Sequence, residues 1–415
     1  NLVVLTDYKQ LYREFLDTGT QIGEDNNANR IPDFYDLMER ISKYAEEHKG
    51  IVLDVRREIT EEKVRREYSD YDYKRHASDM AKDIQFHMIN MKSNISNFKY
   101  VTIIGDDEVI PFYRRNDPTQ EDDPHNPPAK RTWEEGYVSE DMKGRHWGNP
   151  TLLDTKKGYI MTDIPYGIYS AVNPNSVPFP IPDAGVGRIF ANNPSTLLDM
   201  INGFETPINV VPEKSKAVIL GLDSDLKDGG SGVDFPQCIK NALIPVLKTK
   251  YKKQTAPIAL TPYKDGHYYW HDGTLQDWGA ENVVTAIEGS NITLLWSHAT
   301  HLLENTQGYP NITYSSFDNL NISPGHILVN AGCHSGYSVS HNNAQMPMES
   351  YLPYDGGLVK AIISKQVAYL APITYGASQN EQPTEHDLMA KNFLDALLSS
   401  GFSPVGDCLK NIYQK

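Results

Sequence analysis

Two short apolar segments in the second half of the chain end in residues that could carry out nucleophilic chemistry. Residues 294–298 read Leu-Leu-Trp-Ser-His and end in His298, and residues 328–333 read Leu-Val-Asn-Ala-Gly-Cys and end in Cys333. A thiolate is a nucleophile, and a nearby imidazole can take up the thiol proton and later protonate the leaving amine. Open parallel sheets bind ligands at the carboxyl ends of their strands, so two adjacent strands with these ends would bring both groups into one site. The pattern predicts a thiol–imidazole pair.

Small residues surround this cysteine, namely Ala331, Gly332, Ser335 and Gly336. They leave room for a peptide backbone to approach, and backbone N–H groups at this point could stabilise an oxyanion. A different interpretation makes Cys333 a small buried hydrophobe and His298 a hydrogen-bonded polar residue. Two further histidines, His301 and His334, compete for the role of the base.

An acidic, glycine-rich stretch follows the apolar segment at 217–222. Aspartates at short spacing precede a glycine in this stretch, at Asp223, Asp225, Asp228 and Gly229. Such hard oxygens suit Ca²⁺, although the full pattern of a calcium loop is absent. Residues 229–232, Gly-Gly-Ser-Gly, would suit a nucleotide-binding protein, but the Lys-Ser/Thr of a phosphate-binding loop does not follow them. The simplest interpretation is a solvated acidic loop in which Asp234 caps the next helix.

Short β-branched segments alternate with longer amphipathic ones, and this alternation predicts an α/β fold of mainly parallel sheets flanked by helices. The expected strands are residues 2–5, 51–55, 100–104, 217–222, 292–296, 326–330 and 367–371. The expected helices are residues 31–48, 194–204, 236–249, 275–287 and 385–398. The helix at 194–204 has a particularly clear start, because Asn193 is a good cap and Pro194 suits the first turn.

Two features divide the chain. Residues 116–150 are rich in proline, glycine and charge and have no apolar period, which predicts a long surface insertion. Residues 206–213 form a connecting segment with a proline near each end, and a new series of strands and helices follows it. We therefore expect two α/β subdomains, 1–210 with the insertion and 211–415 with the catalytic residues.

Composition excludes several classes of protein. The 415 residues carry 39 Lys and Arg against 54 Asp and Glu, and a net charge of -15 makes nucleic acid an unsuitable partner. No apolar run approaches the roughly 20 residues that a membrane-spanning helix needs. The three cysteines, Cys238, Cys333 and Cys408, cannot all pair within the chain, which argues against a disulfide scaffold. No signal peptide is visible at the start.

From about residue 100 onward the chain resembles the gingipain family of cysteine peptidases, which have the caspase-like fold of clan CD. The resembling segments are residues 101–106 with 110–111, 163–167, 186–188 leading into the helix at 194–204, the strand ending in His298, and residues 330–333. The separation of 35 residues between His298 and Cys333 is also similar to that of the family.

The resemblance implies a cysteine endopeptidase with Cys333 as nucleophile and His298 as acid and base. By the same pattern Asp223 would orient His298, since a carboxylate fixes the tautomer of an imidazole. Asp234, eleven positions later, would lie in the primary specificity pocket and select a basic P1 residue, Arg over Lys, through a bidentate pair.

Substrate-binding roles are also expected for Gly332, which leaves room for a peptide backbone, and for Ala299. The family usually has Gly-His-Gly around its histidine, whereas this chain has Ser297-His298-Ala299, and Ala299 would offer its backbone N–H to the oxyanion. The expected partners are protein or peptide substrates at an extracellular or cell-surface location. No cofactor is required, although structural calcium would fit the family. The alternative is a catalytically inactive, caspase-like binding or adhesion module.

Overall fold

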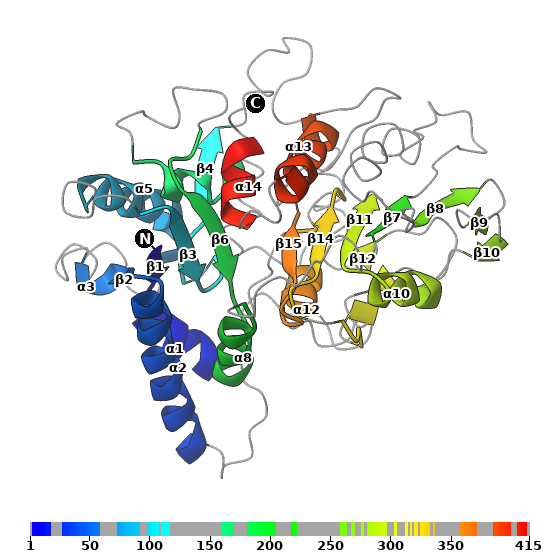
Figure 1. Ribbon diagram of the computed structural model, residues 1–415. Helices are drawn as coiled ribbons and strands as arrows, with labels where there is room; N and C mark the ends of the chain where they lie inside the picture. The colour runs from blue at the N-terminus through cyan, green and yellow to red at the C-terminus, as the bar shows by residue number, and fades with distance from the viewer. Residues whose placement is uncertain are drawn as a thin grey trace. The chain divides into compact units, whose positions relative to one another are not determined.

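The computed structural model forms two compact units (Figure 1). Unit 1 comprises Asn1–Leu198 with Val339–Asp355, and unit 2 comprises Asp199–Ser338 with Gly356–Lys415. The structure describes residues 2–17, 27–58, 73–91, 98–107, 109–116, 159–169, 181–191, 193–204, 217–221, 258–263, 267–269, 275–277, 280–296, 303–304, 312–313, 316–317, 319–322, 324–332, 335–336, 357–371, 385–399 and 405–412.

Unit 1 is built on a parallel sheet of four strands in the order β2-β1-β3-β6. These strands are β1 Leu2–Thr6, β2 Ile51–Asp54, β3 Tyr100–Ile104 and β6 Gly185–Ile189. All five residues of β1 are buried. A strand covered on both faces is expected to be a continuous apolar run, and Leu-Val-Val-Leu is one.

The helices of this part of the chain supply apolar side chains to its core. They are α1 Tyr8–Asp17, α2 Asn27–Glu47, α3 Val55–Glu58, α5 Tyr73–Met91, the 3₁₀ turn η3 Ile164–Gly167, and α8 Pro194–Phe204, which runs across the boundary between the units. Helix α2 lies against β1 and β2 and buries Leu37 and Ile41. The start of α8 is as predicted, because the Thr196 N–H donates to Asn193 Oδ1 at 2.8 Å.

A short antiparallel pair joins β4 Tyr113–Asn116 to β5 Tyr159–Thr162. Its register runs from Tyr113 opposite Thr162 to Asn116 opposite Tyr159. The pair therefore holds together the two ends of the segment that contains the predicted insertion at 116–150. Apart from Asn116, that insertion lies outside the described residues and stays a prediction.

Unit 2 is built on a sheet of seven strands in the order β10-β9-β8-β7-β11-β14-β15. Its strands are β7 Ala217–Gly221, β8 Ile258–Tyr263, β9 His267–Tyr269, β10 Leu275–Asp277, β11 Ile292–Trp296, β14 Ile327–Asn330 and β15 Ala368–Leu370. Neighbouring strands are parallel along the series β8, β7, β11, β14 and β15. Strands β9 and β10 extend the sheet beyond β8 and are antiparallel to their neighbours. A separate antiparallel pair joins β12 Leu303–Glu304 to β13 Ile312–Thr313.

Helices complete unit 2, namely α10 Ala280–Glu288, α12 Gly357–Ile363, α13 Glu385–Ser399 and α14 Val405–Ile412. One apolar cluster joins the central strands to α10 and α12 and includes Leu220, Ile287, Leu295, Leu328 and Ile362. The described residues confirm the predicted α/β class, with mainly parallel sheets flanked by helices.

One predicted helix begins at the wrong residue. We expected a helix over 275–287, but residues 275–277 form strand β10 and the helix begins at Ala280. The reason is tertiary, because β10 pairs with β9 through Leu275 opposite Tyr269, a partner that local periodicity does not reveal. The helix expected at 236–249 lies outside the described residues.

Candidate active site

Strand β11 lies between β7 and β14 in the sheet of unit 2, and all three strands run in the same direction. Trp296 pairs with Gly221 on β7, and Leu295 pairs with Asn330 on β14. The carboxyl ends of the three strands therefore meet at one edge of the sheet. In open parallel sheets this is the edge where ligands bind.

The register of these strands matches the spacing of the predicted catalytic residues. Partners on β7 and β11 differ by 75 positions (221 and 296), which is also the separation of Asp223 and His298. Partners on β11 and β14 differ by 35 positions (295 and 330), which is also the separation of His298 and Cys333. Asp223 and His298 thus each come two positions after the Gly221–Trp296 pair, and His298 and Cys333 each come three positions after the Leu295–Asn330 pair. The predicted histidine follows the middle strand.

Most of the predicted site residues themselves lie outside the described residues. They are Cys333, His298, Asp223, Asp234 and Ala299, together with the competing bases His301 and His334 and the aspartates of the calcium hypothesis, Asp225 and Asp228. Their roles stay predictions. Gly332 is described, and so are the strands that lead to the catalytic positions.

Gly332 is held by hydrogen bonds on both sides of its backbone. Its N–H donates to Asn330 Oδ1 at 2.8 Å, and its carbonyl oxygen accepts the Ser335 hydroxyl at 2.7 Å. The Ser335 N–H also reaches this carbonyl, at 3.4 Å, and the Ala331 N–H donates to Leu295 at 2.9 Å. Since the Gly332 N–H already has an acceptor, its substrate-binding role rests on the space that a glycine leaves rather than on an oxyanion bond.

Tyr369 belongs to the same network and was missed by the sequence analysis. Its hydroxyl accepts a hydrogen bond from Asn330 Nδ2 at 2.9 Å and lies 3.1 Å from the carbonyl oxygen of Ser335, to which it donates. Asn330 and Ser335 are both buried, and Tyr369 is half-buried. No local sequence signal marks this tyrosine, because it comes from β15 and meets the cysteine segment only in the folded sheet.

Another histidine, His326, lies at the opposite, amino-terminal edge of this sheet. It precedes β14, and its Nδ1 lies 3.1 Å from the Ser290 carbonyl while its Nε2 lies 3.0 Å from Thr293 Oγ1. Burial lowers the pKa of His326 to about 4, although the Ser290 carbonyl opposes this shift. A neutral histidine at the amino-terminal edge of the strand is therefore a core residue and not a candidate base.

Of the three cysteines, Cys408 in α14 is the one that lies within the described residues. Its thiol is buried and forms no disulfide. Burial raises the pKa of this thiol to about 11, and the charge of Asp407 adds to the effect. Since the thiolate is the nucleophile, Cys408 is a poor one.

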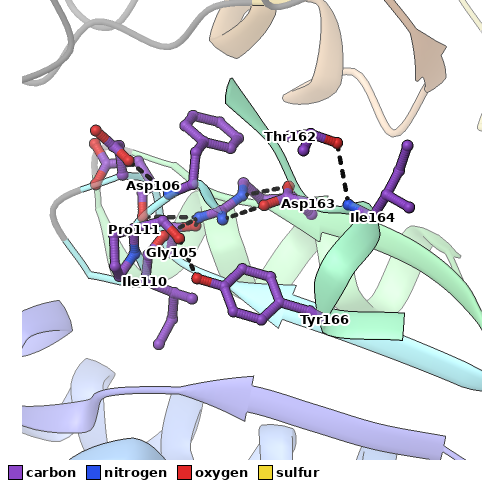
Figure 2. Close-up of polar contacts among 11 residues, drawn as sticks. Gly105, Asp106, Ile110, Pro111, Thr162, Asp163, Ile164 and Tyr166 are labelled. Atoms are coloured by element: carbon purple, nitrogen blue, oxygen red, sulfur yellow. Dashed lines mark hydrogen bonds and ion pairs between the residues drawn. The ribbon is translucent and has the colours of Figure 1, made fainter. Parts of the chain in front are cut away.

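The motif segments of unit 1 meet around the side chain of Arg188, whose partners Gly105, Asp106, Ile110 and Asp163 are labelled in Figure 2. Its Nε and Nη2 form a two-bond ion pair with Asp163, at 2.8 Å to Oδ2 and 2.6 Å to Oδ1. Its Nη1 donates to the carbonyl oxygens of Gly105, Asp106 and Ile110, at 2.7 to 2.8 Å. The side chain is only 5% exposed, so this is a buried guanidinium with every nitrogen bonded.

The surroundings of Arg188 complete this arrangement. Its guanidinium carbon lies 4.3 Å from the centre of the Phe112 ring, and the Tyr166 hydroxyl donates to the Pro111 carbonyl. Gly105, which follows β3, has a φ of 117° that side-chain-bearing residues rarely adopt. The segments 101–106, 110–111, 163–167 and 186–188 therefore share one structural purpose, which is to close the carboxyl edge of β3 and β6.

In the part of the chain that the structure describes, no group of three or more His, Cys, Asp or Glu side chains is arranged to hold a metal ion. Among the helices of this part of the chain, none has the length and apolar character needed to cross a membrane.

The chain is similar to two solved protease structures. Among solved structures, the Arg-specific cysteine proteinase gingipain R is 12% identical, with 80% of this chain and 62% of that chain covered and a TM-score of 0.44. The complex of the pro- and mature domains of Porphyromonas gingivalis RgpB is also 12% identical, with 96% and 68% covered and a TM-score of 0.45. The chain thus spans less than two thirds of the first of these structures. A search of curated proteins finds no match.

The sequence model of Peptidase family C25 matches residues 32–415. This match covers nearly the whole chain and includes every predicted site residue. It does not depend on the distant structural likenesses. The chain therefore belongs to peptidase family C25, the gingipain family that its motifs predicted.

Proposed function

We propose that this chain is a cysteine endopeptidase in which Cys333 is the nucleophile and His298 the general acid and base. The observation that carries the proposal is the agreement between strand register and residue spacing. Asp223, His298 and Cys333 follow three adjacent parallel strands and are separated by the same numbers of positions as the paired residues of those strands, in the order acid, imidazole, thiol. Membership of peptidase family C25 supports the same reaction.

The reaction follows from these three groups. The Cys333 thiolate attacks the carbonyl carbon of the scissile peptide bond, and the resulting oxyanion is stabilised by backbone N–H groups, that of Ala299 among them. The imidazolium of His298 gives its proton to the leaving amine, which releases the first product and leaves an acyl thioester. His298 then removes a proton from water, which attacks the thioester, and the thiolate is regenerated. Asp223 keeps the imidazole in the productive tautomer.

We further propose that the enzyme cuts after a basic residue and prefers Arg to Lys at P1. This specificity rests on Asp234, which follows Asp223 by eleven positions. A carboxylate in a closed pocket needs a cation from the substrate, and the planar guanidinium can bond both of its oxygens. Its substrates would be proteins or peptides at an extracellular or cell-surface location. Any calcium would be structural.

The test combines a peptide library with a single substitution. Fluorogenic peptides that differ only at P1 are incubated with the wild-type chain and with Cys333→Ala, whose small side chain leaves the fold intact. Hydrolysis should be strongest after Arg and should disappear in the variant. Residual turnover within tenfold of the wild-type rate would exclude Cys333 as the nucleophile.

Alkylation distinguishes an enzyme from a non-catalytic binding module. Iodoacetamide should label Cys333 rapidly near neutral pH and stop hydrolysis, and mass spectrometry locates the label. Cys408 is an internal control, because a buried thiol with a pKa of about 11 should stay unlabelled. Slow labelling of Cys333 in a chain that cleaves no peptide would support the binding module.

A further inference from the structure

The hydroxyl of Tyr369 connects two residues that flank the predicted nucleophile in the chain. It accepts from Asn330 Nδ2 at 2.9 Å and donates to the Ser335 carbonyl at 3.1 Å. Asn330 lies three positions before Cys333, and Ser335 lies two positions after it. One oxygen atom thus joins both ends of the segment.

The ring of Tyr369 gives this hydroxyl a fixed position. Strand β15 pairs with β14 in parallel register, with Tyr369 opposite Leu328. The ring packs against the apolar cluster of unit 2, to which Leu328 also belongs. A side chain anchored at its base by a strand and along its ring by the core has little freedom to move its tip.

The side chain of Asn330 is held at both ends of its amide. Its oxygen accepts the Gly332 N–H, and its nitrogen donates to Tyr369. These partners define which end of the amide is which, because a backbone N–H can only donate. Asn330 is 2% exposed, so these bonds are shielded from bulk water.

Ser335 completes the connection from the far side of the segment. Its hydroxyl donates to the Gly332 carbonyl at 2.7 Å, and its own carbonyl accepts from Tyr369. The two residues adjoining the pair 333–334 are therefore bonded both to each other and, through Asn330 and the tyrosine, to β15.

We propose that Asn330, Tyr369 and Ser335 form a positioning clamp that fixes the segment carrying Cys333 for attack. The proposal rests on the function proposed above, in which Cys333 is the nucleophile. In this role the clamp residues act by limiting where the thiolate lies relative to its imidazole, and not by binding the substrate. Positioning of this kind is valuable because a displacement of about 1 Å at a reacting atom can cost about a hundredfold in rate.

The decisive variant is Tyr369→Phe, which keeps the ring in the core and removes only the bridging oxygen. We expect kcat to fall by about ten- to a hundredfold while KM stays within about twofold, because substrate contacts are unchanged. Tyr166→Phe is the matched control. It removes a hydroxyl that donates to a backbone carbonyl in unit 1, and it should keep the wild-type kcat.

A second readout separates positioning from a general loss of folded protein. The rate at which iodoacetamide labels Cys333 is measured against pH in the wild-type chain and in Tyr369→Phe. A looser segment should bring the thiol closer to the ordinary pKa of about 8.5 and move the midpoint upward. A smaller folded fraction would lower the amplitude of the profile without moving its midpoint.

The variant Asn330→Ala removes both arms of the amide and should reduce kcat at least as much as Tyr369→Phe. The double variant should be little worse than Asn330→Ala, because both changes break one clamp. An unchanged kcat and labelling midpoint in Tyr369→Phe would overturn the clamp and leave the peptidase assignment intact. A wild-type chain that cleaves no peptide would overturn the assignment, and the labelling midpoint would still decide the clamp.

Discussion

Arg188 and Asp163 form a two-bond ion pair inside unit 1, and the same guanidinium bonds three backbone carbonyls. These bonds span strand β6, the turn after β3 and the residues before η3. A single side chain thus closes one edge of the sheet in unit 1.

Replacing this arginine should destabilise the protein strongly. In Arg188→Ala the Asp163 carboxylate loses its cation, and the carbonyls of Gly105, Asp106 and Ile110 lose the hydrogen bonds from the guanidinium, which should cost about 3–5 kcal/mol of unfolding free energy. Urea unfolding measures the loss. Lys43→Ala is the control, since its ion pair with Glu47 is largely exposed and should be worth less than about 1 kcal/mol. Equal effects in the two variants would contradict a structural role for Arg188.

The identity of the catalytic base can be settled by comparing three histidines. His298→Ala should lower kcat/KM nearly as far as Cys333→Ala, and the double variant should be no worse, because both changes stop one step. His301→Ala and His334→Ala should each retain most of the activity. A larger loss in either of these two than in His298→Ala would show that the base has been misassigned.

Asp234→Asn tests the proposed specificity pocket. Losing the charge partner of a P1 guanidinium should cost about 3–5 kcal/mol, or roughly two to four orders of magnitude in kcat/KM for Arg substrates. The urea midpoint should hardly change. A preference for an apolar or acidic P1 residue, unaffected by the substitution, would refute the pocket and leave the catalytic pair untouched.

The buried His326 predicts a loss of stability in mild acid. Its folded pKa of about 4 lies below the ordinary 6.5, so the unfolded chain binds the proton more readily. The contribution of His326 to the free energy of unfolding should therefore be fully present above about pH 6.5. It should fall by about 3 kcal/mol as the pH drops toward 4. Protonation would also take away the acceptor that Nε2 offers to Thr293.

Urea unfolding at several pH values checks this expectation. Between pH 6.5 and 4 the wild-type chain should lose more stability than His326→Gln, which has no titrating group at this position. His48→Gln, at an exposed position of unit 1, should keep the wild-type slope. Parallel slopes for wild type and His326→Gln would rule out His326 as the source.

Those parts of the fold that local sequence determines were predicted. The runs at 2–5 and 326–330 identified β1 and β14 because strands buried on both faces are apolar at nearly every position. Asn193 identified the start of α8 because a cap acts on the next turn of the same helix. Strand β6 was not among the expected strands, since two of its five residues are glycine and only its pairing with β3 makes it a strand.

In the candidate site, too, features set by local sequence were predicted and features set by tertiary contacts were missed. Cys333 and His298 were predicted from the ends of two apolar runs and stay predictions, although the register of β11 with β14 agrees with their spacing. Tyr369 could not be found in this way, because its partners lie more than thirty residues away and no periodicity connects them. Arg188 lay in a recognised motif, but its bonds to Asp163 and to the turn after β3 arise only when separate segments fold together.

The pairing of β4 with β5 has a consequence for the maturation of the protein. The segment between these strands contains Lys130-Arg131, a dibasic site of the kind that an enzyme with the proposed specificity would cut. A cut there would leave β3 and β4 in one fragment and β5 and β6 in the other, so that two sets of strand pairings hold the fragments together. Processing would then yield a two-chain protein that separates on a denaturing gel and stays whole in native buffer.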